Sequence, residues 1–221
     1  MRAILFGGTG MVGQGVLLEC ERDADVEEVL AVGRSPLENP GPKVWEIAVT
    51  DLFDLSDLED ELTGFDACFF CLGTSSSGMS EAEYRRVTYE LTISVARMLV
   101  RLNPGMVFEY VSGAGTDSTE KGKTMWARVK GQTENELLGL GFKGAYMFRP
   151  GGIVPMDGIR SKTKMYQAVY TILGPVLPLL KKMFPRYVTT TRELGRAMIR
   201  VAKVGFEKKV IEAEDIGRIA G

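Results

Sequence analysis

The chain of 221 residues contains no histidine. A Ser-His-Asp triad or a Cys-His pair therefore cannot be built, and the commonest metal ligand is missing, so we expect no metal site. An excess of one charge is also lacking, because 27 basic and 29 acidic residues leave a net charge of −2. This balance gives no general attraction to nucleic acid, so we expect no nucleic-acid partner.

Cysteine is scarce, and Cys20, Cys68 and Cys71 are the three present. An odd number with no secretory signal predicts a reducing compartment, and we expect a cytoplasmic location. Cys68 and Cys71 form a C-x-x-C pattern, but the surrounding "DACFFCLG" is typical of a buried strand. Reactive pairs lie at the start of a helix, so we interpret these as core cysteines.

Long hydrophobic runs are absent too, since no segment approaches the roughly 20 apolar residues that span a bilayer. Residues 174–186 combine apolar side chains with Lys181, Lys182 and Arg186, which leaves contact with a membrane surface open. Internal prolines break a continuous amphipathic helix there. A wall of a substrate pocket or a subunit contact, as in a homodimer, is therefore favoured for this segment.

Strand and helix patterns alternate along the chain. Apolar runs predict strands at residues 2–7, 28–34, 43–49, 65–73, 106–113, 144–152 and 208–213. Helical spacing predicts helices at residues 11–22, 80–102, 125–140, 161–173 and 189–204. Such alternation predicts an α/β fold with a doubly wound parallel sheet. We expect one domain over residues 1–221, with a cofactor-binding core (1–150), a small C-terminal substrate-covering region (151–187), and a closing helix and strand (188–221).

The helix expected at 80–102 has a defined start and a buried face. Ser80 and Glu83 have the spacing of a capping box, in which each side chain satisfies a free backbone N–H. The apolar stripe predicted to face the core consists of Tyr84, Val87, Leu91, Val95 and Met98.

A glycine motif, "GGTGMVG", directly follows the first strand and opens the first helix. Gly7 allows the tight turn, Gly10 lets the backbone approach a pyrophosphate, and Gly13 lets the helix pack near the strand. Free N–H groups at the helix start then hold the phosphates. The motif predicts a dinucleotide site, the alternative being a strand–helix turn that binds nothing.

Arg34 indicates which dinucleotide is bound. Sites for NAD place an acid at the end of the second strand, whereas this strand ends in "AVGRS", with Gly33 in that place and Arg34 after it. Arginine pairs with a 2′-phosphate and stacks on adenine, so NADP(H) is favoured over NAD(H), although Arg34 can also be a solvated loop charge. Asp51, after the third strand, can accept a hydrogen bond from adenine, cap the following helix, or do both.

These residues resemble the short-chain dehydrogenase/reductase superfamily in its atypical or extended form. The resemblance covers nearly the whole chain, including "CFFCLGTSS", "YVSGAG", "WARVKGQTE", "FRPGGIV" and "VTTTRELGRAMIRVA". It is closest to Tat-interacting-protein-like reductases and bacterial NAD-dependent epimerase/dehydratase proteins, and it implies a Rossmann-type fold. The cofactor contacts that it implies are Gly7, Thr9, Gly10, Met11, Val12, Gly13, Arg34, Asp51, Leu52, Leu72, Gly73, Thr74, Lys130, Pro150, Gly151 and Ile153.

The catalytic residues implied by the resemblance include one departure. Ser112 stands at the serine that holds the substrate oxygen, and Lys130 at the lysine that binds the ribose. The tyrosine that donates or accepts the proton is replaced by Trp126. An indole N–H does not titrate in the useful range, so it cannot serve as a general acid or base.

Two functions stay open on this evidence. The chain can be an oxidoreductase acting on a small, apolar carbonyl or alcohol, with a proton from water, from Ser112, or from Tyr166, Tyr170 or Tyr187. It can instead be a catalytically inactive NADP(H)-binding sensor or scaffold. The substrate itself is not predicted.

Overall fold

The computed structural model describes residues 1–159 and 187–221, and seven strands in it form one parallel sheet in the order β3-β2-β1-β4-β5-β6-β9. Their bounds are Arg2–Phe6 (β1), Glu28–Gly33 (β2), Val44–Ala48 (β3), Ala67–Phe70 (β4), Val107–Val111 (β5), Gly144–Arg149 (β6) and Val210–Glu212 (β9). The order reverses between β1 and β4, as in a doubly wound sheet. The predicted fold class is therefore confirmed.

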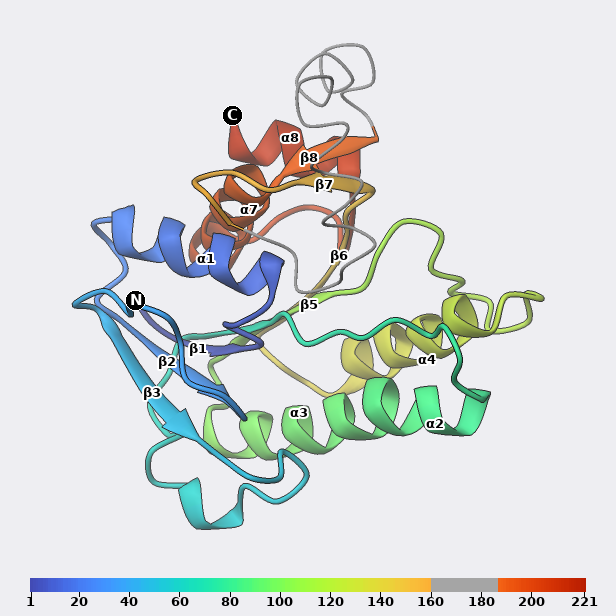
Figure 1. Cartoon of the computed structure of the whole chain (residues 1–221), viewed down its shortest axis with the longest axis horizontal. Coiled ribbons are helices and arrows are strands. Elements are labelled where there is room, and N and C mark those ends of the chain that lie inside the picture. Colours follow the sequence, from blue (N-terminus) through green and yellow to red (C-terminus); the bar gives the residue numbers. More distant parts are fainter. Residues whose placement is uncertain (160–186) are drawn as a thin grey trace.

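Helices cover both faces of the sheet (Figure 1). One face carries α1 (Met11–Arg22), α7 (Thr191–Val204) and α8 (Ala213–Ala220), and the other carries α2 (Glu81–Arg85), α3 (Leu91–Leu102) and α4 (Met125–Gly139). Side chains of β1 alternate between two buried clusters, with Ile4 and Phe6 toward α3, and Ala3 and Leu5 toward α1 and α7. Burial on both faces explains why the central strands read as continuous apolar runs.

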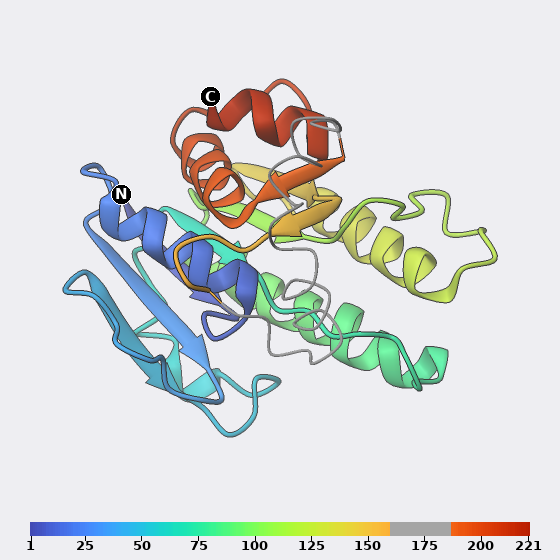
Figure 2. The same ribbon diagram turned by 45° about the horizontal axis from the view of Figure 1, so that its top comes forward.

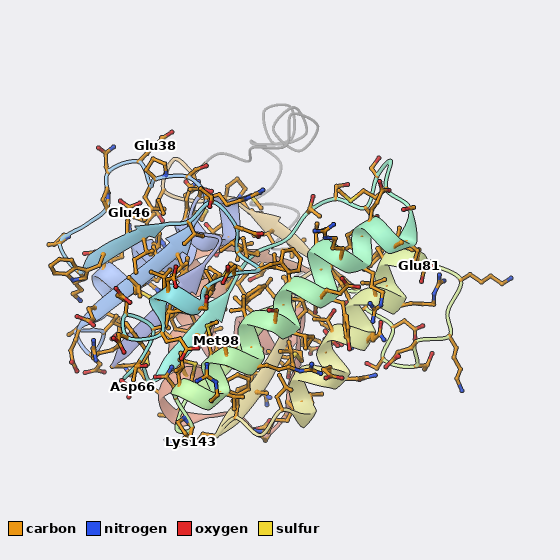
Figure 3. The ribbon with its side chains drawn as sticks, turned by 90° about the horizontal axis from the view of Figure 1, so that it is seen from below. Glu38, Glu46, Asp66, Glu81, Met98 and Lys143 are labelled. Atoms are coloured by element: carbon orange, nitrogen blue, oxygen red, sulfur yellow. The ribbon has the colours of Figure 1, made fainter. Side chains whose placement is uncertain are left out.

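The helix predicted at 80–102 is interrupted by a π-helical turn, Arg86–Glu90, between α2 and α3. The capping box of Ser80 and Glu83 is present as predicted. The stripe prediction was wrong at Val87, which is 39% exposed, because the wider turn shifts the helical phase and buries Thr88 instead. Figure 3 shows α2 and α3 beside α4, with Glu81 labelled at the start of α2 and Met98 labelled in α3.

A second, two-stranded sheet joins β7 (Gly152–Val154) and β8 (Val188–Thr190) in parallel, near α8 (Figure 2). The Gly152 N–H donates to the Tyr187 carbonyl at 2.9 Å, and a Cβ on Gly151 would lie 2.2 Å from the same oxygen. These two short strands were not predicted from the sequence. The predicted helix 161–173 and most of the substrate-covering region lie outside the described residues.

Segment 174–186, for which contact with a membrane surface was considered, also lies outside the described residues. Among the helices that are described, none is both long and apolar enough to cross a bilayer.

Candidate functional site

A cleft of about 1070 Å³ runs along the carboxyl edge of the sheet. Its lining begins where five strands end, with Gly7 after β1, Arg34 after β2, Leu72 beyond β4, Ser112 after β5 and Pro150 after β6. The cleft spans the point between β1 and β4 where the strand order reverses, which is where ligands bind in open α/β sheets.

Most of the predicted cofactor contacts meet in this cleft. Those that line it are Gly7, Thr9, Gly10, Met11, Val12, Arg34, Leu52, Leu72, Gly73, Thr74, Lys130, Pro150, Gly151 and Ile153. Gly13 and Asp51 do not. Gly13 is buried behind the turn, and exposed Asp51 accepts a hydrogen bond from the Phe53 N–H at 2.9 Å. The capping role considered for Asp51 was wrong, because the next helical turn, Ser56–Leu58, has Leu55 at its N-cap.

The glycine turn has the geometry that close packing requires. Gly7 has a φ of +88°, and a Cβ there would lie 2.8 Å from the carbonyl of Cys71. A Cβ on Gly13 would lie 2.2 Å from the Gly7 carbonyl oxygen. At Gly10, the nearest atom to a Cβ would be the Gly7 oxygen at 3.3 Å, so a side chain there would project into otherwise open space. Gly10 therefore keeps a cradle open at the N-terminus of α1.

The N-terminus of α1 also has the electrostatics of an anion site. Its first turn contains no acidic residue, and Gly10 at the N-cap offers no side chain to satisfy the free backbone N–H groups. These N–H groups and the positive end of the helix dipole favour a phosphate. The cleft thus fits the pyrophosphate of a dinucleotide at this point.

The end of the cleft beside β2 and β3 holds charges of both signs. Arg34 is exposed, and it has no ion-pair or hydrogen-bond partner in the described part of the chain. Glu46 on β3 also lines the cleft, and its Oε1 accepts a hydrogen bond from the Leu37 N–H at 2.6 Å. Figure 3 shows Glu46 and Glu38 on the same side of the molecule, away from Glu81. Arg34 is therefore available to an anionic group that enters here.

At the other end, Ser112 belongs to a buried polar network. Its hydroxyl donates to the carboxylate of Glu134, which is fully buried on α4, and the Phe148 carbonyl lies 3.2 Å away. Glu134 is also paired with the guanidinium of Arg149, whose Nε lies 3.0 Å from Oε1. Arg149 reaches Glu212 of β9 at 3.3 Å. The hydrogen of Ser112 is thus directed at Glu134, while its oxygen can still accept a hydrogen bond.

Trp126 and Lys130 both line the cleft and lie one turn apart on α4. The Lys130 Nζ donates to the backbone carbonyl of Ser112. Burial lowers the pKa of Lys130 to about 8, although the negative charge of Glu134 acts in the opposite direction. Trp126 is half-buried, and its indole carries no titratable group.

Sequence reasoning missed Tyr84 as a residue of the cleft, because it was counted only as part of the apolar stripe of its helix. Burial raises the pKa of its hydroxyl. Of the tyrosines considered as proton donors, Tyr187 is 69% exposed and does not line the cleft, and Tyr166 and Tyr170 lie outside the described residues. No sequence signal indicates that Tyr84 of α2 meets the cleft.

The C-x-x-C cysteines are also clarified by the structure. Cys68 is buried in the cluster toward α3, whereas Cys71 packs against the opposite cluster and lines the cleft. The two side chains therefore lie on opposite faces of the sheet. Burial raises the pKa of both thiols, which leaves them protonated and unreactive.

No protein-family model matches the chain. Among curated proteins, it is 23% identical over 205 residues to the mitochondrial protein FMP52 of Debaryomyces hansenii, covering 91% of this chain and 88% of that protein. It is 29% identical over 153 residues to the mitochondrial FMP52 of Eremothecium gossypii, covering 68% and 66%.

Solved structures share the fold at low identity. Helicobacter pylori ADP-L-glycero-D-manno-heptose-6-epimerase has a TM-score of 0.69 at 16% identity, over 99% of this chain and 81% of that one. MoeE5, in complex with UDP-glucuronic acid and NAD, has a TM-score of 0.69 at 18% identity, over 95% and 75%. An oxidoreductase of the short-chain dehydrogenase/reductase family from Burkholderia thailandensis has a TM-score of 0.68 at 15% identity, over 97% and 92%.

The chain has the Rossmann-type fold of these enzymes. Its sequence relatives are FMP52 proteins, and similarity to the Tat-interacting-protein-like branch stays a prediction. The predicted cytoplasmic location was wrong by this comparison, because the curated relatives are named mitochondrial. Unpaired cysteines argue against an oxidising compartment and do not distinguish one reducing compartment from another.

Proposed function

We propose that the protein binds NADP(H) in this cleft and reduces a small carbonyl compound. The observation that carries the proposal is that the glycine turn, Arg34 and Lys130 line one continuous cleft at the carboxyl edge of the sheet. When bound, a reduced nicotinamide dinucleotide supplies a hydride. The residues of the chain would hold that cofactor, orient the carbonyl group and supply a proton.

Three parts of the cleft would hold the cofactor. The N-terminus of α1, with its cradle at Gly10, would bind the pyrophosphate, and Lys130 would donate a hydrogen bond to the nicotinamide ribose. The preference for NADP(H) rests on Arg34, whose charge has no partner among the described residues. Glu46 lies at the same end and opposes a 2′-phosphate, so Arg34 must outweigh it.

The substrate would lie beyond Lys130, toward β5 and β6. The cleft there is lined by Trp126, Tyr84, Val111 and Ile153, whose surfaces are largely apolar. An apolar lining favours a small apolar aldehyde or ketone over a charged or heavily hydroxylated one. The Ser112 oxygen can accept a hydrogen bond from the hydroxyl group of the alcohol product.

Turnover of NADPH by the purified full-length chain, measured at 340 nm with a panel of aldehydes and ketones, tests the proposal. We expect measurable consumption, and we expect Trp126→Tyr to raise kcat by on the order of 10-fold or more, because a phenol can donate a proton and an indole cannot. Trp45→Tyr is the matched control, since Trp45 is 66% exposed on β3 and lies outside the cleft lining. Tight NADPH binding without turnover of any carbonyl compound would exclude a reductase.

A second candidate is an NADP(H)-binding protein that catalyses no reaction. Trp126 in the tyrosine position favours it, as does the hydrogen bond that commits the Ser112 hydroxyl to Glu134. Such a protein would bind NADPH in the same cleft, and its binding constant would stay unchanged in Trp126→Tyr. The turnover experiment separates the two candidates.

A further inference from the structure

The cleft offers few groups that can release a proton to a substrate oxygen near neutral pH. Trp126 does not titrate, and the hydroxyl hydrogen of Ser112 is directed at Glu134. Burial raises the pKa of Tyr84 and of Cys71, so both hold their protons more tightly than usual. Arg34 and Glu46 line the opposite end of the cleft, beside β2 and β3, so Lys130 is the titratable group left at the Ser112 end among the described residues.

Lys130 is well placed for such a role. It lies between Trp126, one turn earlier on α4, and Glu134, one turn later. Its Nζ donates to the Ser112 carbonyl, which uses one of the three N–H bonds of an ammonium and leaves one for the nicotinamide ribose and one for a substrate oxygen. The Ser112 carbonyl thus anchors the Lys130 ammonium at the end of β5, within the cleft lining.

The surroundings of Lys130 favour loss of its proton. Burial disfavours the ammonium and lowers its pKa to about 8, and the charge of Glu134 offsets only part of this shift. The carboxylate of Glu134 is itself paired with Arg149 of β6. The phenols of Tyr84 on α2 and Tyr110 on β5 stay neutral, because burial raises their pKa values. On the helices packed against α4, Glu81 is held in an ion pair with Arg128, and Arg85 is held in one with Glu90.

We propose that Lys130 is the proton donor of the carbonyl reduction, in place of the missing tyrosine, an inference that rests on the proposed reductase function. With NADPH bound, the nicotinamide would supply a hydride to the carbonyl carbon, and the electron pair of the carbonyl π bond would move to oxygen. That oxygen forms a bond to one Lys130 hydrogen as the N–H bond breaks. The neutral amine regains a proton from water, so each turnover consumes one proton.

This role fixes the pH dependence of both reaction directions. Reduction requires the ammonium, so kcat/KM is level below pH 8 and falls as pH rises through about 8, approaching 10-fold per pH unit. Oxidation of the alcohol requires the neutral amine, so its rate rises with pH up to about 8 and is level above that value. The ratio of the two rates changes with pH for any proton donor, because reduction consumes a proton, so the break near pH 8 in each profile is the feature that identifies Lys130.

Lys130→Arg tests the role, because arginine keeps the charge and the N–H donors but does not give up a proton in this pH range. We expect kcat for reduction to fall by about 10²- to 10⁴-fold, and we expect the decrease of kcat/KM above pH 8 to disappear. The Kd for NADPH should change less than 10-fold, measured by quenching of Trp126 fluorescence in a Trp45→Phe background. Lys143→Arg, at an exposed lysine outside the cleft, is the matched control and should leave kcat, the pH profile and the Kd for NADPH unchanged.

A direct titration gives a readout that does not depend on turnover. In protein without cofactor, labelled with [¹³C]lysine, the Cε resonance that disappears in Lys130→Arg should titrate near pH 8. A titration midpoint of this resonance near the usual lysine pKa of about 10.4 would overturn the proposal. A decrease of kcat/KM above pH 8 that persists in Lys130→Arg would also overturn it. In both cases wild-type consumption of NADPH leaves the reductase function standing. If the wild type reduces no carbonyl compound, the reductase function and the role of Lys130 both fall.

Discussion

Arg34 differs from most arginines of this protein because its guanidinium has no ion-pair partner among the described residues. Arg22, Arg149 and Arg196 are held in ion pairs by neighbouring carboxylates, whereas Arg34 has no such partner in the described residues and lies at the open end of the cleft. An unpaired exposed guanidinium loses little hydration or pairing energy when a phosphate binds to it. This property gives Arg34 its role in the proposed preference for NADP(H).

Substitution of Arg34 should therefore change the choice of cofactor. We expect Arg34→Ala to weaken NADPH binding by about 10- to 100-fold, corresponding to a charge-assisted hydrogen bond of about 1.5–3 kcal/mol, and to leave NADH binding nearly unchanged. Glu46→Gln keeps an oxygen to accept the Leu37 N–H but removes the charge, so it should strengthen NADPH binding. Both are measured by fluorescence titration, and equal losses for NADPH and NADH in Arg34→Ala would contradict the assignment.

At the scale of elements, α4 carries Trp126 and Lys130 into the cleft, and two sets of contacts fix its position. Glu134 binds it to β6 through Arg149 and to β5 through Ser112. On another side, the loop after β5 packs against the helix, and the Asp117 N–H donates to the Ala127 carbonyl at 3.0 Å. Gly131 permits this approach, since a Cβ there would lie 1.8 Å from the Asp117 carbonyl oxygen.

Gly131→Ala should consequently displace that loop from α4. We expect the free energy of unfolding to fall by about 1–3 kcal/mol, the usual effect of overpacking, as measured by urea denaturation. Gly139→Ala is the matched control in the same helix, because a Cβ at Gly139 would meet no atom within 4 Å. It should leave stability unchanged or raise it by up to about 1 kcal/mol, since alanine favours the helix. A similar loss in both variants would show that the approach of the loop is not the cause.

The stability of the whole molecule depends on a carboxyl group at the centre of the sheet. Glu109 of β5 is fully buried between Phe69 of β4 and Tyr146 of β6, and neither of its oxygens has a hydrogen-bond partner among the described residues. Burial raises its pKa well above the usual range. The folded protein therefore holds this proton at pH values where the unfolded chain releases it, and stability falls as pH rises from about 4.3 toward the folded pKa.

Removal of this carboxyl group should stabilise the fold. We expect Glu109→Met to raise the free energy of unfolding at pH 7 by about 1–3 kcal/mol, because a buried unpaired polar group is replaced by an apolar one of similar length. The gain should grow from pH 5 to pH 7 by up to about 1.4 kcal/mol per pH unit, as measured by urea denaturation. Glu38→Met, at an exposed position, is the control for the added methionine. A gain that does not vary with pH would mean that Glu109 keeps its usual pKa.

Some features were predictable because they depend on neighbours along the chain. The order of the seven strands of the main sheet follows from local apolar spacing, and the capping box from Ser80 and Glu83 alone, whereas α8 and the strands β7 and β8 were not predicted. The glycine turn was predictable for the same reason, since strand, turn and helix are contiguous. Val87 was mispredicted because a π-helical turn changes the phase of the helix, and the spacing of apolar residues does not reveal such a turn.

The sequence by itself determined the parallel α/β fold, the glycine turn and the absence of a tyrosine four residues before Lys130. Only the tertiary structure decided what surrounds the reactive groups: the Ser112 hydrogen is directed at Glu134, Tyr84 reaches the cleft, and burial brings the pKa of Lys130 to about 8. The physical reason is that hydrogen bonds and burial depend on groups far apart in the chain, which folding brings together. Strand and helix patterns depend on residues a few positions apart.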